Sequence, residues 1–302
     1  MVRCTTLLIL SFFGCVVPVS LVAETRVLAH RFGETEISGT PERVVSLSFI
    51  GHDFLLGLDT VPIALRYWYG DGPFGIWPWA THKLDDAEPI VIYGGIDVEE
   101  IALLKPDLIL AQWSGITEVE YQLLSRVAPT VPPPVGATDY SASWQQMLSQ
   151  IGLALNKMDA AQAQIIQIEA QFERVRTVYP EWKVNTEVTV WPNQIGADTR
   201  SELRCKFMEE LGFVNAPEVE ALAINNTYNV RISRENLDPI DTDVLIWLTV
   251  SDPIAALDNI ALRKTMRAYR EGREVIADPV LTAAMSHSVR LRSPTFCRVS
   301  NP

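Results

Sequence analysis

Aromatic side chains and an arginine gather in one short segment, LRYWYGDGPFGIWPWA (residues 65–80), together with three glycines and two prolines. Aromatic faces provide a large apolar area on few rotatable bonds, and a planar guanidinium group provides several hydrogen-bond donors. These groups could contact a ligand through apolar area and through hydrogen bonds. Tryptophan and tyrosine are also commonly buried for packing alone, so some of them could simply hold the loop down. The predicted ligand contacts in this segment are Arg66, Trp68, Tyr69, Trp77 and Trp79.

More aromatic and arginine side chains lie where other predicted strands end. In open parallel sheets, ligands bind in the crevice outside the carboxyl ends of the strands. The strand predicted over 61–66 therefore delivers residues 67–79 to the rim of such a crevice. Further candidate ligand contacts in comparable positions are Tyr93, Trp113, Trp191, Tyr228 and Arg231. Arg200 and Arg204, at the start of a helix predicted over 201–212, are weaker candidates.

The residue patterns of common catalytic sites are missing from the sequence. There is no G-x-S-x-G segment and no phosphate-binding loop. The four histidines are scattered without the spacing of metal ligands, so no side-chain metal site is predicted. The chain carries 37 acidic and 25 basic residues, a formal net charge of −12, which argues against nucleic acid as a partner. The residues alone thus offer no pattern for catalysis, for a metal site or for nucleic-acid binding.

Short β-branched runs alternate with helical stretches, which is the pattern of parallel α/β sheets. Strands are predicted at 43–48, 61–66, 90–95, 107–113, 187–191, 243–250 and 273–278, with a short edge strand at 130–134. Between the two groups of strands, residues 144–179 contain hardly any helix breaker, and Ile165, Ile168 and Phe172 form one apolar stripe. A single long helix connecting two lobes is the predicted arrangement.

The two halves share a spacing. When Glu99 is aligned with Glu235, apolar residues coincide two places on, and Asp107 and Asp243 coincide eight places on, each before three apolar strand residues. Each half therefore carries a predicted short helix that begins with a glutamate, then a turn and a buried strand. Any helix-turn-strand unit produces a similar pattern, because glutamate suits a helix start and aspartate suits a turn. Identical spacing around a long helix nevertheless indicates two related lobes.

With these features together, the chain resembles the periplasmic substrate-binding proteins of ABC transporters, in the group that serves ferric siderophores, haem and cobalamin. The segments that carry the resemblance are PERVVSLS (41–48), the aromatic segment, GGIDVEEIALLKPDLILAQW (94–113), the long helix and ISRENLDPIDTDVLIWLT (232–249). The resemblance implies two Rossmann-like α/β lobes with mostly parallel sheets and a ligand cleft between them. The implied boundaries are an N-terminal lobe at 24–153, a bridging helix at 154–180 and a C-terminal lobe at 181–302.

The resemblance also implies the partners. The ligand would be a ferric siderophore that arrives already chelated, and surface glutamates, one per lobe, would dock onto arginines of the membrane permease. Glu99 and Glu235 match those positions; from the residues alone they are solvated charges near helix ends. A monomer is expected. The alternatives are a haem or cobalamin binder of the same fold, or a non-transporting relative, because WPNQIGADTR (191–200) is shorter than the family's second-lobe stretch.

The chain ends carry separate expectations. Residues 1–23 have a charged start, an apolar run and a small residue at 23, which indicates a secretory signal peptide cut after Ala23 and an extracytoplasmic protein. A lipoprotein signal at Cys15 fits the pattern less well. In the mature chain Cys205 and Cys297 are either a disulfide pair or two thiols. The basic tail 287–302 lacks the terminal helix of the family and is either a diverged or a frameshifted end.

Overall fold

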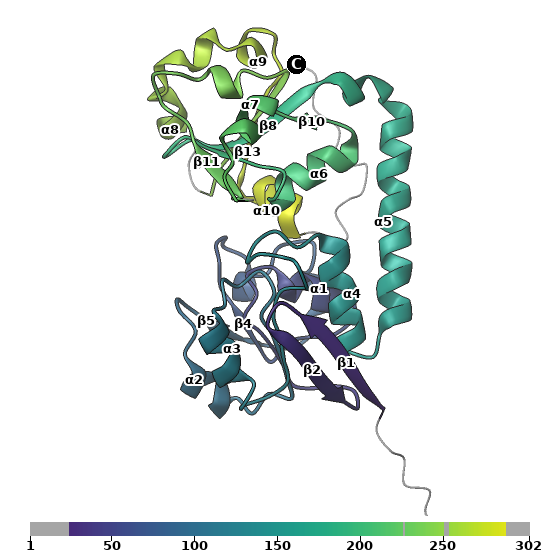
Figure 1. Cartoon of the computed structure of the whole chain (residues 1–302). Coiled ribbons are helices and arrows are strands. Elements are labelled where there is room, and N and C mark those ends of the chain that lie inside the picture. Colours follow the sequence, from purple (N-terminus) through teal and green to yellow (C-terminus); the bar gives the residue numbers. More distant parts are fainter. Residues whose placement is uncertain (1–23, 226, 251–253, 288–302) are drawn as a thin grey trace, which may run out of the picture.

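The computed structural model describes residues 24–225, 227–250 and 254–287. Two mainly parallel sheets are present, each built from one half of the chain, and a long helix runs beside both of them (Figure 1). The predicted α/β class with mostly parallel sheets is confirmed.

The first sheet has five parallel strands in the order β5-β4-β3-β6-β7. The strands are β3 (Val44–Ser46), β4 (Ala64–Arg66), β5 (Ile90–Ile92), β6 (Leu108–Leu110) and β7 (Thr130–Val131). Strands β3 and β6 are buried at every position, as continuous apolar runs in a parallel sheet should be. The connecting helices are α1 (Gly51–Gly57), η1 (Pro73–Gly75), η2 (Thr81–Lys83), α2 (Val98–Leu103) and α3 (Glu118–Leu124).

An antiparallel hairpin precedes this sheet. Strands β1 (Thr25–His30) and β2 (Gly33–Ser38) pair over their whole length. Alternate residues of β1 are buried, with Leu28 and Ile37 in the core, which is the period-2 pattern of a half-buried strand. The alternation is present in the sequence, but neither strand was predicted.

The second sheet has the order β11-β9-β8-β12-β13, with β10 also paired to β8. Strands β8, β10, β12 and β13 are parallel, whereas β9 runs antiparallel to both of its neighbours, β8 and β11. Neither β9 nor β11 was predicted. The strands are β8 (Thr186–Trp191), β9 (Gly196–Asp198), β10 (Val214–Asn215), β11 (Asn229–Arg231), β12 (Val244–Leu248) and β13 (Glu274–Ala277). The helices are α6 (Leu203–Leu211), α7 (Pro217–Leu222), η4 (Asp238–Ile240), α8 (Ile254–Asp258), η5 (Ala261–Thr265), α9 (Arg267–Arg270) and α10 (Pro279–His287).

The helical stretch predicted over 144–179 is two helices, α4 (Trp144–Ala154) and α5 (Met158–Val178), followed by η3 (Pro180–Val184). The chain breaks because Asn156 adopts a left-handed conformation (φ +57°), which asparagine tolerates better than most residues, and the Lys157 N–H bonds Gly152 O. The predicted apolar stripe of α5 is confirmed, since Ile165, Ile168 and Phe172 are all buried.

The internal spacing corresponds to one shared structural role. Asp107 accepts hydrogen bonds from the backbone N–H groups of Glu42 and Arg43, just before β3 (both 2.8 Å). Asp243 does the same for the N–H of Thr186, at the start of β8 (2.8 Å). Each aspartate thus ties the entry of its own strand, β6 or β12, to that of the neighbouring strand.

The helix predicted to begin at Glu235 is wrong. Residues 234 and 235 form a turn, and only the short 3₁₀ helix η4 follows. Pro239 explains the difference from α2, because proline disfavours the helical conformation of the preceding residue and has no N–H to donate. The corresponding stretch in the first half has no proline before Pro106, so α2 forms.

The apolar core divides only in part between the two halves, because three clusters of buried residues each lie within one half, whereas the largest cluster contains residues of both. Its largest cluster joins α4 and α5 to residues of α6, β12 and α10, including Leu203, Met208, Leu248 and Met285. The lobe boundaries at 153 and 181 therefore stay a prediction. Cys205 is buried, while Cys297, the signal segment and the tail from 288 onward lie outside the described residues. No helix in the described ranges is long and apolar enough to cross a membrane.

Candidate functional site

A cavity of about 560 Å³ opens between the two halves of the molecule. The first half contributes four aromatic residues to its lining: Phe49, Trp68, Trp113 and Tyr140. The second half contributes one tryptophan and a polar set: Trp191, Gln194, Gly196, Asp198, Glu202, Arg204, Thr227, Tyr228, Asn229 and Arg231. We call this cavity the central pocket. Its walls combine aromatic faces with two arginines and two carboxyl groups.

Five aromatic rings in tilted or T-shaped contact form a continuous wall of the central pocket, from Phe49 to Tyr228. The ring centroids of Phe49 and Trp68 are 5.8 Å apart, those of Trp68 and Trp113 are 5.0 Å, and those of Trp113 and Tyr140 are 4.9 Å. The ring of Tyr140 then meets Tyr228 at 5.3 Å, and this last contact crosses from one half of the chain to the other. Contacts of this tilted or T-shaped kind hold each ring in one orientation.

The backbone after β6 places Trp113 in this wall. Trp113 has φ +53°, an outlier for a bulky side chain that costs on the order of 1–3 kcal/mol. Its indole N–H donates to the carbonyl of Tyr140 (3.2 Å). Gly115 also has a positive φ (+71°), and a Cβ there would lie 2.7 Å from the Tyr140 hydroxyl. The strained turn thus fixes Trp113 and leaves room for Tyr140 beside it.

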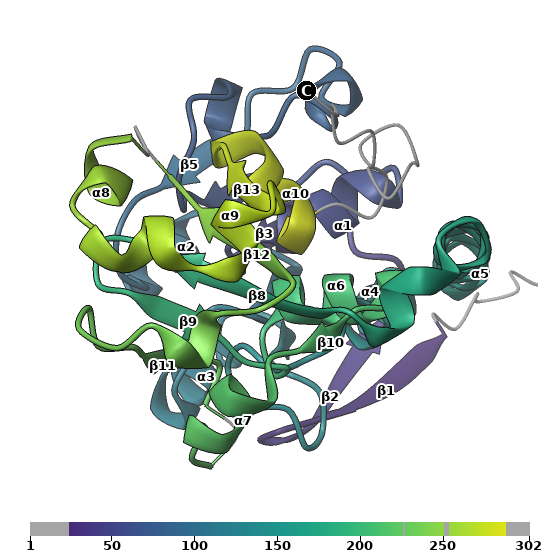
Figure 2. The same ribbon diagram turned by 90° about the horizontal axis from the view of Figure 1, so that it is seen from above.

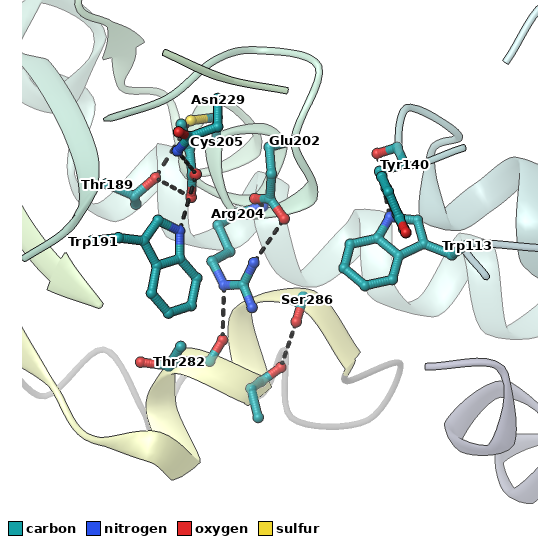
Figure 3. A network of polar contacts seen from close by, with 12 residues as sticks. Trp113, Tyr140, Thr189, Trp191, Glu202, Arg204, Cys205, Asn229, Thr282 and Ser286 are labelled. Carbon is teal, nitrogen blue, oxygen red and sulfur yellow. Dashed lines mark hydrogen bonds and ion pairs between the residues drawn. The ribbon is translucent and has the colours of Figure 1, made fainter. Parts of the chain in front are cut away.

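Arg204 is the buried cation of the central pocket. Its guanidinium carbon lies 5.1 Å from the ring centroid of Trp191 and 5.5 Å from that of Trp68, so the cation contacts an aromatic ring from each half. Its Nη1 donates to Glu202 (2.7 Å) and its Nε donates to the carbonyl of Thr282 in α10 (3.1 Å; Figure 3). Burial lowers the pKa of Arg204, but Glu202, Tyr69 and Asp198 together more than reverse this, and the pKa lies above its usual value. The guanidinium is therefore a permanent charge that spans both halves of the pocket.

Asp198, the last residue of β9, lies next to Trp191 in the lining of the central pocket and is 1% exposed. Its Oδ1 accepts from the indole N–H of Trp191 (3.1 Å) and the amide of Asn229 (2.9 Å; Figure 3). Burial, and next the nearby Glu202 carboxylate, raise the pKa of Asp198 to about 7, against the opposing effect of Arg204. This carboxyl group thus changes charge near neutral pH.

Half of the ten ligand contacts predicted from the sequence line the central pocket. They are Trp68, Trp113, Trp191, Tyr228 and Arg231. Their three tryptophans follow or end parallel strands, β4, β6 and β8, which is where ligands bind in open parallel sheets. Ligand contact by these residues stays a prediction.

The other five predicted contacts do not line this pocket. Trp77 is 4% exposed and stacks on Trp79, whose indole N–H donates to Asp53 of α1 (2.7 Å). Tyr69 packs edge-on between Trp68 and Trp77, with ring centroids 4.6 and 5.3 Å away. Packing thus accounts for Trp77 and Trp79, whereas the Tyr69 hydroxyl also interacts with Arg204. Trp68 is the residue of this group that lines the cavity.

Arg66 and Tyr93 lie outside the lining of the central pocket. Arg66 donates to the carbonyls of Gly94 (2.9 Å) and Ser114 (3.0 Å), and its guanidinium carbon lies 4.2 Å from the Phe49 ring centroid. It therefore ties together the loops that follow β4, β5 and β6 and backs one pocket residue. Tyr93 is 71% exposed and contacts only the ring of Tyr67 among the described aromatic rings.

The predicted docking glutamates are both exposed. Glu99 lies in the first turn of α2, whose N-cap is Asp97, and Glu235 lies in the turn after β11. Helix α2 and strand β11 are both on the side of the molecule away from α5 (Figures 1 and 2).

Several residues of the pocket were not predicted, or were ranked low, from the sequence. Tyr140 comes from the irregular stretch before α4, where no periodicity marks it, and Asp198 and Asn229 come from the unpredicted antiparallel strands. Arg204 is only a weaker candidate from the sequence, where it is one of two arginines near the start of a predicted helix. Its burial depends on α10 and on Trp68, which are distant in sequence, so no local signal could have raised its rank.

Within the described residues, no cluster of three or more His, Cys, Asp or Glu side chains is arranged to hold a metal ion. The lining of the central pocket contains neither histidine nor cysteine. Its chemistry is that of aromatic contact, hydrogen bonding and charge, which suits a preformed ligand with apolar arms.

Comparison with known proteins gives one consistent family. Residues 44–282 match the periplasmic binding protein family. A curated relative, the ferric-anguibactin-binding protein FatB of Vibrio anguillarum, is 26% identical over 267 residues, covering 83% of this chain and 79% of FatB. The Fe(3+)-citrate-binding protein YfmC of Bacillus subtilis is 25% identical over 262 residues, covering 84% and 79%. A solved periplasmic solute binding protein from Mycobacterium smegmatis is 32% identical, covers 90% of this chain and 94% of its own, and superposes with a TM-score of 0.78.

Proposed function

The chain belongs to the periplasmic binding protein family, and we propose that it captures a ferric siderophore outside the cytoplasm and delivers it to an ABC importer. Two relatives that span most of this chain are described as binding ferric complexes, ferric anguibactin and ferric citrate. The family consists of binding proteins, so no catalytic step is part of the proposal.

The observation that carries the proposal is the composition of the central pocket. A ring wall from Phe49 to Tyr228 suits the organic arms of a chelate, because aromatic side chains bury a large area with little loss of conformational entropy. The buried Arg204 sits between Trp68 and Trp191, where it pairs with Glu202 and interacts with the Tyr69 hydroxyl. A guanidinium held in this way is a donor group suited to an oxygen of the ligand.

Fluorescence titration tests the ligand class. The protein without residues 1–23 is titrated with a panel of ferric siderophores, with haemin and with cobalamin, while tryptophan emission is followed. We expect quenching at micromolar or lower concentration by a ferric siderophore. Quenching by haemin or cobalamin, and by no ferric siderophore, would refute the proposal in favour of those alternatives.

Two matched variants test whether the ligand that quenches tryptophan emission binds in the central pocket. Trp68→Phe shortens the wall and removes part of the surface over Arg204, so affinity should fall about tenfold, equivalent to about 1.4 kcal/mol. Trp182→Phe is the control, because Trp182 stacks between Tyr179 and Phe213 and does not line the pocket. Equal losses in both variants would contradict binding at this site.

Delivery is proposed to use Glu99 and Glu235 as contacts to basic residues of the permease. Both are exposed, and neither lines the pocket. Replacement of both by alanine should abolish uptake in cells that carry the importer and leave ligand affinity unchanged. Glu169→Ala, on the exposed side of α5, is the control and should transport normally. Transport by the double variant would overturn the docking assignment, and no transport by the parent protein would favour a non-transporting relative.

Export and oligomeric state complete the proposal. Cleavage after Ala23 would release a monomer that starts at Glu24, one residue before β1. Mass spectrometry of the exported protein gives the first residue directly, and light scattering gives the mass in solution. A lipid attached to Cys15 would replace cleavage after Ala23 by a membrane anchor.

A further inference from the structure

Asp198 holds two of the residues that form the pocket wall. Its Oδ1 accepts from Trp191 and Asn229, and both donors line the central pocket. Its Oδ2 accepts from the hydroxyl of Thr189 on the neighbouring strand β8 (3.2 Å). These three hydrogen bonds fix the carboxyl group directly behind the space that a ligand would occupy.

The charges that face Asp198 leave the buried floor of the pocket negative when Asp198 is ionised. Arg204 is matched by Glu202, which donates nothing and accepts from the guanidinium at 2.7 Å, so the pair has little net charge. Glu187, fully buried on β8, has a pKa raised well above its usual value, first by burial, which favours its uncharged form. The other titratable or charged groups on the elements packed against Asp198 are Cys205 on α6, whose pKa is also raised by burial, Lys206, Glu209 and Glu210 further along α6, and the exposed Arg231 on β11.

The hydrogen bonds around Asp198 accommodate the neutral acid without any movement of heavy atoms. The two donors at Oδ1 need only an acceptor, which a protonated carboxyl group still provides. At Oδ2 the direction can reverse, because the Thr189 hydroxyl can accept a hydrogen bond from the protonated acid and turn its own hydrogen toward Cys205 Sγ (3.5 Å). Both charge states of Asp198 therefore fit the same pocket.

We propose that Asp198 takes up one proton from solvent, at Oδ2, when an anionic chelate enters the central pocket, so that binding of anionic ligands is coupled to proton uptake. The ligand places a second negative charge near a buried carboxylate whose only cationic neighbour in the buried floor is already paired, and protonation removes that repulsion. A neutral chelate brings no such charge and binds without the proton. This inference rests on the proposed function, because it requires the pocket to admit a ferric chelate.

Calorimetry in two buffers measures the proton directly. An anionic ferric tris-catecholate and a neutral ferric tris-hydroxamate are titrated at pH 8 in phosphate and in Tris, whose enthalpies of ionisation differ. For the anionic chelate we expect uptake of close to one proton, and a dissociation constant that rises up to about tenfold per pH unit above pH 7. For the neutral chelate we expect neither effect.

Two variants separate a proton site from a structural role. Asp198→Asn keeps an acceptor at Oδ1 and an amide that can donate to Thr189, and it should bind the anionic chelate with no proton uptake and a flat pH profile. Asp53→Asn is the matched control, because Asp53 is also a buried carboxyl group bonded to an indole N–H and has a pKa raised by burial to about 7, but it does not line the pocket. This control should retain proton uptake.

The outcomes are distinct. Binding of the anionic chelate with no buffer-dependent enthalpy in the parent protein overturns the coupling and leaves the proposed function intact. Binding of the neutral chelate alone also overturns it, because the pocket then excludes anionic ligands. Failure of every ferric chelate to bind at any pH refutes the proposed function itself, and the inference with it.

Discussion

The ion pair between Arg204 and Glu202 offers the sharpest test of how the central pocket is built. Both side chains are almost completely buried, with exposures of 2% and 4%. Glu202 makes a second contact, because its Oε2 accepts from the backbone N–H of Arg204 (2.6 Å) and caps α6. Glu202→Gln keeps the shape of the side chain and one acceptor oxygen while it removes the charge.

The expected cost follows from leaving a buried cation without its partner. Removal of one member of a buried ion pair typically costs about 3–5 kcal/mol of unfolding free energy, since the remaining charge loses its compensation. Asp198 is the nearest buried group able to replace the lost carboxylate, and it is ionised above pH 7. The loss of unfolding free energy in Glu202→Gln should therefore be about 3 kcal/mol at pH 8 and about 5 kcal/mol at pH 5, where Asp198 is protonated in the parent protein.

Urea unfolding of the parent protein and variants at pH 5 and pH 8 measures both values. Glu173→Gln provides the control, because its pair with Arg176 is partly exposed and should contribute less than about 1 kcal/mol. The double variant Glu202→Gln/Arg204→Met removes both charges and should recover much of the stability lost in Glu202→Gln. A double variant whose loss equals the sum of the two single losses, or a single loss that does not depend on pH, would refute the reasoning.

Two further predictions concern other positions. Gly115→Ala should destabilise the protein by at least about 1 kcal/mol and weaken ligand binding, since its φ is +71° and the new Cβ would displace the Tyr140 hydroxyl; Gly136→Ala has the same backbone cost (φ +78°) with open space around it, and should leave binding unchanged. Burial lowers the pKa of His52 to about 4, so its contribution to stability is present above pH 6.5 and is lost as pH falls toward 4. His52→Leu should therefore flatten the denaturation profile between pH 7 and pH 4.5 by about 2 kcal/mol, and an unchanged slope would contradict the buried neutral state.

The fold was accessible from the sequence where the signal was local. Apolar runs such as 107–113 predict buried parallel strands, and Gly212 predicts the end of α6, where it adopts φ +110°. The predictions failed where one residue redirected the chain. Asn156 splits the long helix, and Pro239 prevents a helix at Glu235, and both effects are physically readable once the positions are known.

The site was accessible only in part, because the sequence identifies residues suited to ligand contact but not which of them face the cavity. Trp68 and Trp77 lie in the same aromatic segment, yet one lines the central pocket and the other packs under Gly70. The difference arises from α1, which supplies Asp53 as the partner of the Trp77–Trp79 stack. Such contacts depend on tertiary structure and leave no trace in local composition.

The buried charges of the pocket are expected to act as one unit. Glu202 raises the pKa of Asp198 and Arg204 lowers it, so removal of the Glu202 charge in Glu202→Gln should leave Asp198 as the counter-ion of Arg204. Asp198 would then stay ionised when an anionic chelate binds, and proton uptake should fall in Glu202→Gln as it does in Asp198→Asn. The effects of the two substitutions on the pH profile of binding should consequently be non-additive, because each removes the same proton from the reaction. Additive effects would mean that Asp198 and Glu202 act on the ligand separately, and would contradict the view that the buried charges act together.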